Sequence, residues 1–396
     1  MKSVKNQRLT ETERSRYSIK PNAGKGLIGF IANFNIAGEF EPAWWKIKGN
    51  GLEFLARVEV CRLHHTKKLS ILWSCILKPK IFISRPIPDN VVARLSQVCQ
   101  VDMWHTSETL PPIAEKISDL DGLMTYGHEP VTAEMMDTAP NLKVITTVGV
   151  GYDHVDAVAA KRRNISVGNT PDVLSATTAD MTFALLLSVA RNVVPGNTFV
   201  QNKQWSYYDP NILWGQEVHD ATIGIVGMGR IGYAVAKRAL GFDMRVLYNK
   251  RQRRLDWEEE LGIEYAELND LLQSSDFVTL HPPMSDETYH LIGQRELALM
   301  KPNAILVNIA RGPVVDGRAL YQALKDREIA GAALDVTEPE PINPDHPLLT
   351  LDNVVICPHL GSATNQTRMK MANMATDNIL AGLKGQPLPY EVAATR

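Results

Sequence analysis

One segment constrains the fold more than any other: an apolar strand, TIGIV, leads into a glycine-rich turn that opens a helix. The turn reads GMGRIG and has the G-x-G-x-x-G pattern, formed by Gly227, Gly229 and Gly232. In this context the first glycine permits a tight turn, the second lets the backbone approach a pyrophosphate, and the third lets helix and strand pack closely. The pyrophosphate is then expected on the exposed N–H groups of the helix start, Arg230 and Ile231. The segment predicts a dinucleotide-binding domain.

Short apolar strands alternate with helical stretches from Lys78 onward. A first series of strands is KIFISRP, DGLMTYG, KVITTVGVG and ISVGNTP, and a second is ATIGIVGMG, MRVLYN, FVTLHP, AILVNIA, GAALDV and NVVICP. Such alternation predicts an α/β fold with parallel sheets covered on both faces, and six strands suffice for a complete dinucleotide-binding domain. A long apolar helix over residues 177–193 separates the series, and the helix after His359 can return to the first domain.

Composition excludes several classes of protein. The net charge of -2 and the lack of long like-charge blocks argue against a nucleic-acid surface. The four cysteines are widely spaced without a C-x-x-C pair, so we expect free thiols and no metal site. No apolar run reaches the roughly 18 residues that span a bilayer. The N-terminus resembles neither a signal nor a transit peptide, so a cytoplasmic location is expected.

The first 76 residues differ from the rest, because they show no sustained period of strand or helix. We therefore expect residues 1–77 to be an N-terminal extension outside the fold. A docking tail is one explanation. The hypothesis we favour is that translation truly starts near Leu77.

The end of the second strand indicates which dinucleotide is preferred. An acidic residue there usually binds the ribose 2′-hydroxyl of NAD, whereas this chain has Asn249. The basic residues that follow can hold a 2′-phosphate: Lys250, Arg251, Arg253 and Arg254. NADP(H) is therefore favoured, with NAD(H) possible. The alternative is a solvated basic loop before the acidic helix LDWEEEL.

Three charged residues lie just after the last three strands, at the edge where open α/β sheets bind ligands. They are Arg311, Glu340 and His359. An arginine can hold a carboxylate and polarise a carbonyl, a histidine can protonate an alkoxide, and a carboxylate can orient that histidine. Each residue alone has an ordinary structural explanation. Together they predict reduction of a small 2-oxo acid by hydride transfer, with His359 as proton donor.

From about Lys78 onward the chain resembles the D-isomer-specific 2-hydroxyacid dehydrogenases, and within them the glyoxylate/hydroxypyruvate reductases. The resemblance rests on motifs in the family's order: TVGVGYDHVD, NTPDVLSATTAD, GIVGMGRIG, LVNIARGPVVD, LDVTEPEP and HPLLTLDNVVICPHLGSAT. It implies the same roles for Arg311, Glu340 and His359. It also implies that Val150 and Gly151 offer backbone donors to the substrate carboxylate, and that the cofactor lies against Asp335, Pro283, Ile309 and Gly361.

The resemblance further implies a two-domain architecture. A Rossmann-type dinucleotide-binding domain, residues 176–361, is inserted into a flavodoxin-like substrate-binding domain of residues 78–175 and 362–396. Family members are usually homodimers joined through the long helix and the loop after it, which sends an aromatic residue into the partner's active site. Tyr208 matches that position. No nucleic-acid or membrane partner is expected.

These arguments predict an NADPH-preferring reductase of glyoxylate and hydroxypyruvate, giving glycolate and D-glycerate. One alternative is a reductase of 2-ketogluconate or another 2-oxo acid. Phosphoglycerate dehydrogenase is disfavoured because only 37 residues follow His359. Formate dehydrogenase is disfavoured because that enzyme has Gln where Glu340 stands. A dinucleotide-sensing co-regulator on the same fold stays open.

Overall fold

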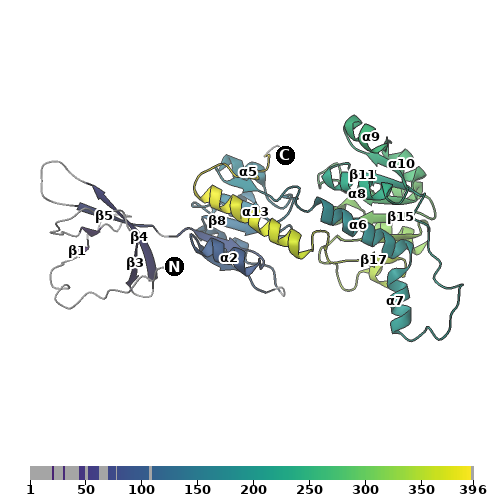
Figure 1. The fold of residues 1–396 in the computed structure, drawn as a ribbon, viewed down its shortest axis with the longest axis horizontal. Helices are drawn as coiled ribbons and strands as arrows, with labels where there is room; N and C mark the ends of the chain where they lie inside the picture. Colours follow the sequence, from purple (N-terminus) through teal and green to yellow (C-terminus); the bar gives the residue numbers. More distant parts are fainter. Residues whose placement is uncertain are drawn as a thin grey trace. The chain divides into compact units, whose positions relative to one another are not determined.

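The computed structural model describes residues 78–106 and 109–393, together with five strands that lie before residue 77. The chain divides into two compact units, Met1–Pro79 and Lys80–Arg396 (Figure 1). The hypothetical start at Leu77 lies outside the described residues.

The described part of the first unit consists of strands. A two-residue pair, β1 (Lys20–Pro21) and β2 (Phe30–Ile31), is antiparallel, as is a three-stranded sheet of β3 (Trp44–Gly49), β4 (Leu52–Cys61) and β5 (Ser70–Ile76). The prediction that this segment has no strand or helix periodicity is wrong. Within β4, apolar residues occupy every second position from Leu52 to Val60, which is the period of a strand.

The second unit contains a five-stranded parallel sheet in the order β10-β9-β8-β6-β7, the flavodoxin-like order 2-1-3-4-5. Its strands are β6 (Lys80–Ile83), β7 (Gln100–Met103), β8 (Gly122–Thr125), β9 (Val144–Thr147) and β10 (Ser166–Gly168). The sequence analysis missed β7, an edge strand whose residues are only partly buried. The associated helices are α2 (Asp89–Ser96), α3 (Ile113–Lys116), η1 (Ile117–Asp119), α4 (Ala133–Asp137) and α5 (Ala157–Arg162). The C-terminal helix α13 (Asn365–Leu383) packs on β8 and β9, as predicted (Figure 1, yellow).

A seven-stranded parallel sheet follows, in the order β13-β12-β11-β14-β15-β16-β17. Its strands are β11 (Thr222–Val226), β12 (Arg245–Asn249), β13 (Glu264–Tyr265), β14 (Phe277–Leu280), β15 (Ile305–Asn308), β16 (Gly331–Leu334) and β17 (Val354–Ile356). Six of these were predicted; β13, with two residues, is too short to show a period. The strand order reverses between the neighbouring strands β11 and β14. The glycine turn follows β11, so it lies at this crossover point, where such sheets bind ligands.

Apolar cores cover both faces of the seven-stranded sheet. One face packs against α6 (Ser175–Ala190), α8 (Arg230–Leu240) and α9 (Leu255–Leu261), and the other against α10 (Leu268–Ser274), α11 (Gln294–Leu299) and α12 (Gly317–Lys325). Two short helical turns, η2 (Gly312–Val314) and η3 (Pro347–Thr350), lie in loops. The continuous apolar strands predicted from the sequence are therefore covered on both sides, as parallel sheets require.

The predicted helix over residues 177–193 is corrected to two helices. The first, α6, ends at Ala190, Asn192 adopts a left-handed conformation with φ 52°, and α7 (Val193–Gln201) follows. The backbone of Asn192 cannot continue a right-handed helix, so the chain bends there. Among the described residues no single helix is long and apolar enough to cross a bilayer, and α6 and α7 meet that test only as a pair bent by 61°.

Candidate active site

The carboxyl edge of the seven-stranded sheet collects the residues that the sequence singled out. The glycine turn follows β11, Asn249 ends β12, and the remaining candidates follow β15, β16 and β17. Because all seven strands are parallel, these ends lie at one edge of the sheet.

The glycine turn has the shape that the motif predicts. Gly227 has φ +94°, and a Cβ there would lie 2.6 Å from the backbone nitrogen of Pro282. A Cβ on Gly232 would lie 2.6 Å from the carbonyl oxygen of Gly227, so helix and turn approach closely. A Cβ on Gly229 would meet nothing within 4 Å, and α8 begins at the next residue. Open space therefore lies beside a helix start, which fits a bound pyrophosphate.

Two of the basic residues after β12 form ion pairs with carboxylates of the helix that follows, α9. Arg253 contacts Glu258 at 3.1 and 2.5 Å, and Arg254 contacts Asp256 at 2.9 and 2.6 Å. Arg251 is exposed, and in the part of the chain that the structure describes it has no ion pair or hydrogen bond. Arg251 is thus the guanidinium best placed to take a 2′-phosphate without first losing a carboxylate partner.

Two residues close to Arg251, Asn249 and Lys250, also shape the electrostatics of this loop. The Nδ2 atom of Asn249 donates to the carbonyl oxygen of Ala266 at 2.9 Å, so its amide is held in place. Burial, reinforced by the charge of Arg254, lowers the pKa of Lys250. Neither residue presents a negative charge to the 2′ position of a dinucleotide.

Arg311 contacts the loop after β9, which belongs to the other sheet. Its Nε and Nη2 atoms donate to Asp153 at 3.2 and 3.0 Å, and Nη1 donates to the carbonyl oxygen of Ala310 at 2.9 Å. A guanidinium has five N–H groups, so two stay available for a substrate carboxylate. Burial raises the pKa of Asp153, but the charge and hydrogen bonds of Arg311 outweigh it and lower that pKa. Asp153, which the sequence analysis missed, orients the arginine as a charged partner.

The backbone around Gly151 completes the carboxylate site. A Cβ on Gly151 would lie 1.7 Å from Nη2 of Arg311, so only glycine lets the guanidinium approach. Among the described residues, the N–H groups of Val150 and Gly151 have no backbone acceptor. These N–H groups can accordingly donate to an anion held by Arg311.

His359 and Glu340 form the predicted pair. The Nδ1 atom of His359 lies 2.6 Å from Oε1 of Glu340, which leaves Nε2 to face a reacting group. His359 has φ +56°, a conformation that costs energy for a residue with a side chain. The loop is fixed by Asp335, whose carboxylate accepts from the N–H groups of Leu360 and Gly361, both at 2.7 Å. Burial raises the pKa of Asp335 against these two bonds.

A second histidine joins this pair, and the sequence analysis missed it. The Nε2 atom of His128 lies 3.2 Å from the same Oε1 of Glu340, and its ring meets the His359 ring edge-on at 5.3 Å. His128 follows β8, so the argument applied to the second sheet, a titratable residue just after a strand, would have found it in the first.

The electrostatics of the three residues are coupled. Burial alone raises the pKa of Glu340, but hydrogen bonds from His128 and His359 outweigh it and lower that pKa to about 2. The hydrogen bond to Glu340 raises the pKa of His128, against burial, which lowers it. Glu340 is therefore charged over the whole physiological range. The nearest side-chain atoms of the three residues lie within 4.8 Å of one another, so a change in the charge of one is felt by the other two.

The remaining predicted residues differ in how the structure places them. Ile309 is buried in the core beneath the sheet edge, and a Cβ on Gly361 would lie 3.6 Å from its Cδ1. Pro283 is exposed just after β14. Arg230 pairs with Asp172 at 2.5 Å, and Ile231 packs against the cores of both sheets. Tyr208 is 79% exposed in the loop after α7.

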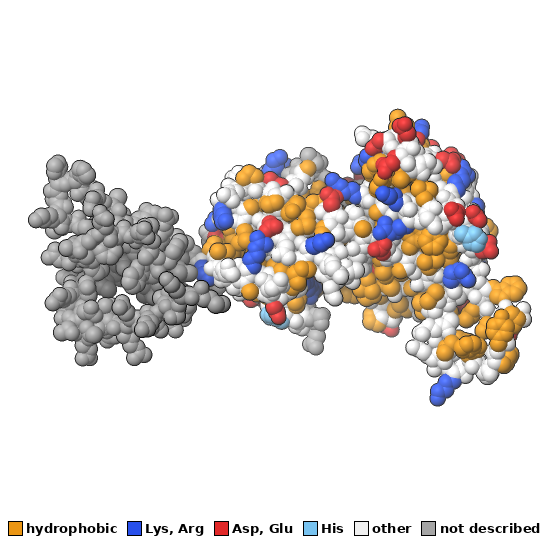
Figure 2. All heavy atoms as spheres, in the orientation of Figure 1, with side chains coloured by type: hydrophobic (Ala, Val, Ile, Leu, Met, Phe, Trp, Pro, Cys, Tyr) orange, Lys and Arg blue, Asp and Glu red, His pale blue; other side chains and the backbone are white. Residues whose placement is uncertain are grey.

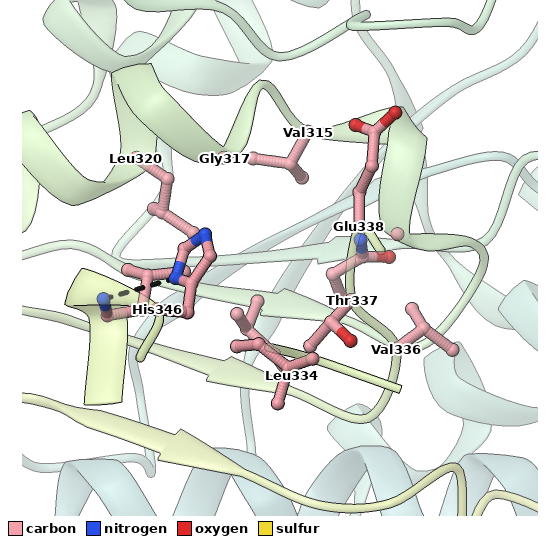
Figure 3. A pocket seen from close by; sticks show the side chains of 12 residues that line it. Val315, Gly317, Leu320, Leu334, Val336, Thr337, Glu338 and His346 are labelled. Carbon is pink, nitrogen blue, oxygen red and sulfur yellow. Dashed lines mark hydrogen bonds between the residues drawn. The ribbon is translucent and has the colours of Figure 1, made fainter. Parts of the chain in front are cut away.

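A small pocket lies behind the loops of Arg311 and Glu340 (Figure 3). Most of its wall is apolar, from Val315, Leu320, Leu334 and Val336. The Nδ1 atom of His346 accepts from the N–H of Leu348 at 3.2 Å, the dashed line in Figure 3. The apolar part of the wall therefore belongs to the packing behind the two loops.

Together with the fold, these groups fit one class of protein: a dehydrogenase that moves a hydride between a nicotinamide dinucleotide and a small 2-oxo or 2-hydroxy acid. Comparison with known proteins gives the family. Residues 183–361 match the profile described as D-isomer specific 2-hydroxyacid dehydrogenase, NAD binding domain. The chain belongs to this family and is an NAD(P)-dependent dehydrogenase. The resemblance and the two-domain α/β fold predicted from the sequence are confirmed.

Individual relatives support this assignment. A glyoxylate reductase of Korarchaeum cryptofilum is 47% identical over 318 residues, which cover 79% of this chain and 95% of that protein. A glyoxylate reductase of Pyrococcus furiosus is 47% identical over 319 residues, with the same coverage. Among solved structures, a Thermus thermophilus protein has a TM-score of 0.75 at 42% identity and covers 79% of this chain and 100% of its own. An NADPH-dependent glyoxylate/hydroxypyruvate reductase of Sinorhizobium meliloti, in complex with NADP and malonate, has a TM-score of 0.72 at 31% identity, covering 81% of this chain and 98% of its own.

Proposed function

We propose that this dehydrogenase reduces glyoxylate and hydroxypyruvate, with NADPH preferred over NADH. The observation that carries the proposal is the placement of Arg311, Glu340 and His359 at one sheet edge, beside a turn open to a dinucleotide. The relatives named glyoxylate reductase support the substrate class. Arg251 and the absence of an acid at Asn249 support the cofactor preference.

The residues divide the chemistry among them. Arg311, with the N–H groups of Val150 and Gly151, holds the substrate carboxylate and orients the neighbouring carbonyl. When bound, the nicotinamide supplies the hydride that is added to that carbonyl carbon. His359 gives its Nε2 proton to the oxygen on which negative charge develops, and Glu340 stabilises the charged ring before transfer. In the reverse direction the neutral His359 ring takes the proton back.

We also propose that the protein is a homodimer joined through α7 and the loop that follows. Nine large apolar side chains there are exposed: Val193, Val194, Val200, Trp205, Tyr207, Tyr208, Ile212, Leu213 and Trp214. Figure 2 shows apolar side chains gathered on this part of the surface, at the lower right. Such a concentration is typical of an interface. Light scattering after gel filtration tests it, and a monomer at micromolar concentration would contradict it.

Steady-state kinetics test the proposed reaction. We expect the highest kcat/KM for glyoxylate or hydroxypyruvate with NADPH, and lower values for pyruvate and 2-ketogluconate. A higher value for 2-ketogluconate would make the chain a sugar-acid reductase. Binding of NADPH without turnover of any of the four acids would favour the co-regulator hypothesis instead.

A further inference from the structure

His128 comes from the other sheet but meets the catalytic pair at one atom. It lies in the loop between β8 and α4, and its Nε2 contacts the same Glu340 oxygen that faces Nδ1 of His359. The side chain is 39% exposed, so burial does not force it into this position. One carboxylate oxygen therefore serves two imidazoles.

The loop that carries His128 is anchored by its neighbour Glu129, which is only 4% exposed. Three groups donate to Oε2 of Glu129, at 3.0 to 3.1 Å: Ser84 Oγ, Thr125 Oγ1 and the N–H of Tyr126. Arg85 Nε donates to the other oxygen at 2.9 Å. A buried carboxylate is costly unless its oxygens are satisfied in this way. The backbone beside His128 is thus held by contacts that do not involve Glu340.

Several charged groups face these rings. Glu129 comes from the loop of His128 itself, Glu340 from the loop after β16, and Arg311 from the loop after β15. Asp335 lies beside His359. His154, from the loop after β9, also faces His128, but burial lowers its pKa to about 4, so it stays neutral near pH 7. The group that bonds both rings is Glu340.

We propose that His128 is a positioning residue that shares the Glu340 carboxylate with His359 and so limits how firmly His359 holds the proton that it donates. A hydrogen bond to a carboxylate oxygen reduces the negative charge with which that oxygen attracts a second donor. Without His128, the charge of Glu340 acts on His359 alone. The positive charge that His128 carries when protonated is lost as well, and this second effect has the same sign. The inference rests on the proposed function, because it needs His359 to be the proton donor.

Two substitutions at position 128 test the inference in the full-length enzyme. His128→Ala removes the donor, and we expect the fall of reductive kcat at alkaline pH to move upward by about 0.5–1 pH unit. The rising limb of hydroxy-acid oxidation should move upward equally. His128→Gln places a neutral amide N–H near the position of Nε2, so it should restore the hydrogen-bond part of the effect and give a smaller upward shift than His128→Ala. KM for the 2-oxo acid should change less than about twofold, because ground-state binding is not removed.

The controls separate the possible failures. His219→Gln changes an exposed histidine that lies 3.9 Å from two carboxylates, before β11 and thus at the opposite edge of the sheet, and should leave the profile unchanged. An unchanged or downward-shifted limb in His128→Ala, or a Gln variant that behaves like the Ala variant, would overturn the inference. Wild-type enzyme without 2-oxo acid reduction would instead overturn the proposed function.

A measurement without turnover provides a second readout. NMR signals of the His128 ring should titrate at lower pH in Glu340→Gln than in wild type, because the bond to Glu340 raises the pKa of His128. An equal midpoint in the two proteins would show that His128 does not contact Glu340 in solution, and the inference would fail whatever the enzyme reduces.

Discussion

Replacing Arg251 by alanine should weaken the use of NADPH and leave the use of NADH almost unchanged. The structure singles out this residue among the basic side chains after β12. Arg253 and Arg254 each hold a carboxylate of α9, so binding a phosphate would require them to give up or share that partner. Arg251 is exposed and, within the described residues, unpaired.

The expected size of the effect follows from the type of bond. A hydrogen bond to a charged group contributes about 1.5–3 kcal/mol, which corresponds to a loss of roughly 10- to 150-fold in kcat/KM for NADPH. Arg251→Lys keeps the charge but not the planar fork, so it should lose less. Arg253→Ala should also lose less, because that guanidinium is already engaged with Glu258.

The assay is steady-state reduction of glyoxylate at saturating acid, with each cofactor varied in turn. Arg162→Ala, an exposed arginine on α5, is the matched control and should behave as wild type with both cofactors. Equal losses with NADPH and NADH would show that the loop does not read the 2′-phosphate. A wild-type enzyme that prefers NADH would refute the cofactor proposal itself.

Three further predictions concern the catalytic pair and the N-terminal unit. His359→Ala should lower kcat by roughly 10²- to 10⁴-fold with little change in cofactor affinity measured by fluorescence; a kcat near wild type would remove His359 from the reaction. Hydrogen bonds from His128 and His359 lower the pKa of Glu340 in the folded protein from 4.5 to about 2, so the stability that its charge contributes is complete above pH 4.5 and lost as pH falls toward 2. The difference in unfolding free energy between wild type and Glu340→Gln should shrink over that window in urea titrations, and a difference that is constant with pH would contradict the assignment. A truncated chain that begins at Leu77 should fold and keep full activity, since the chain divides at Pro79 into separate units; an insoluble or inactive product would show that the extension is needed.

The parts of the site that follow directly from local sequence were predictable. Arg311 and His359 each come just after a continuous apolar strand, and parallel strands end at a common edge, so their proximity needs no long-range information. The glycine turn is equally local, because its spacing and the flanking strand and helix determine its geometry.

What could not be predicted depends on contacts between segments far apart in the chain. His128 and Asp153 follow strands β8 and β9 of the first sheet; their place after a strand marks them as candidates, but nothing in the local sequence indicates that they meet Glu340 and Arg311 of the second. The ion pair between Arg253 and Glu258 could not be predicted either, since it depends on how a short loop folds back on α9. The bend at Asn192 was missed because the apolar pattern continues through it.

The contacts between the two sheets' loops bear on how the site works. Among the described residues, three charged pairs join them: Arg230 with Asp172, Arg311 with Asp153, and His128 with Glu340. The first of these pairs is well exposed and is worth on the order of 1 kcal/mol or less. The other two lie inside the candidate site, where the substrate carboxylate and the reacting carbonyl would be. Opening the two sheets would separate Arg311 from its orienting carboxylate and His128 from Glu340 in one motion. Under the proposed function, substrate capture and readiness for proton transfer would therefore depend on the same placement of the two sheets.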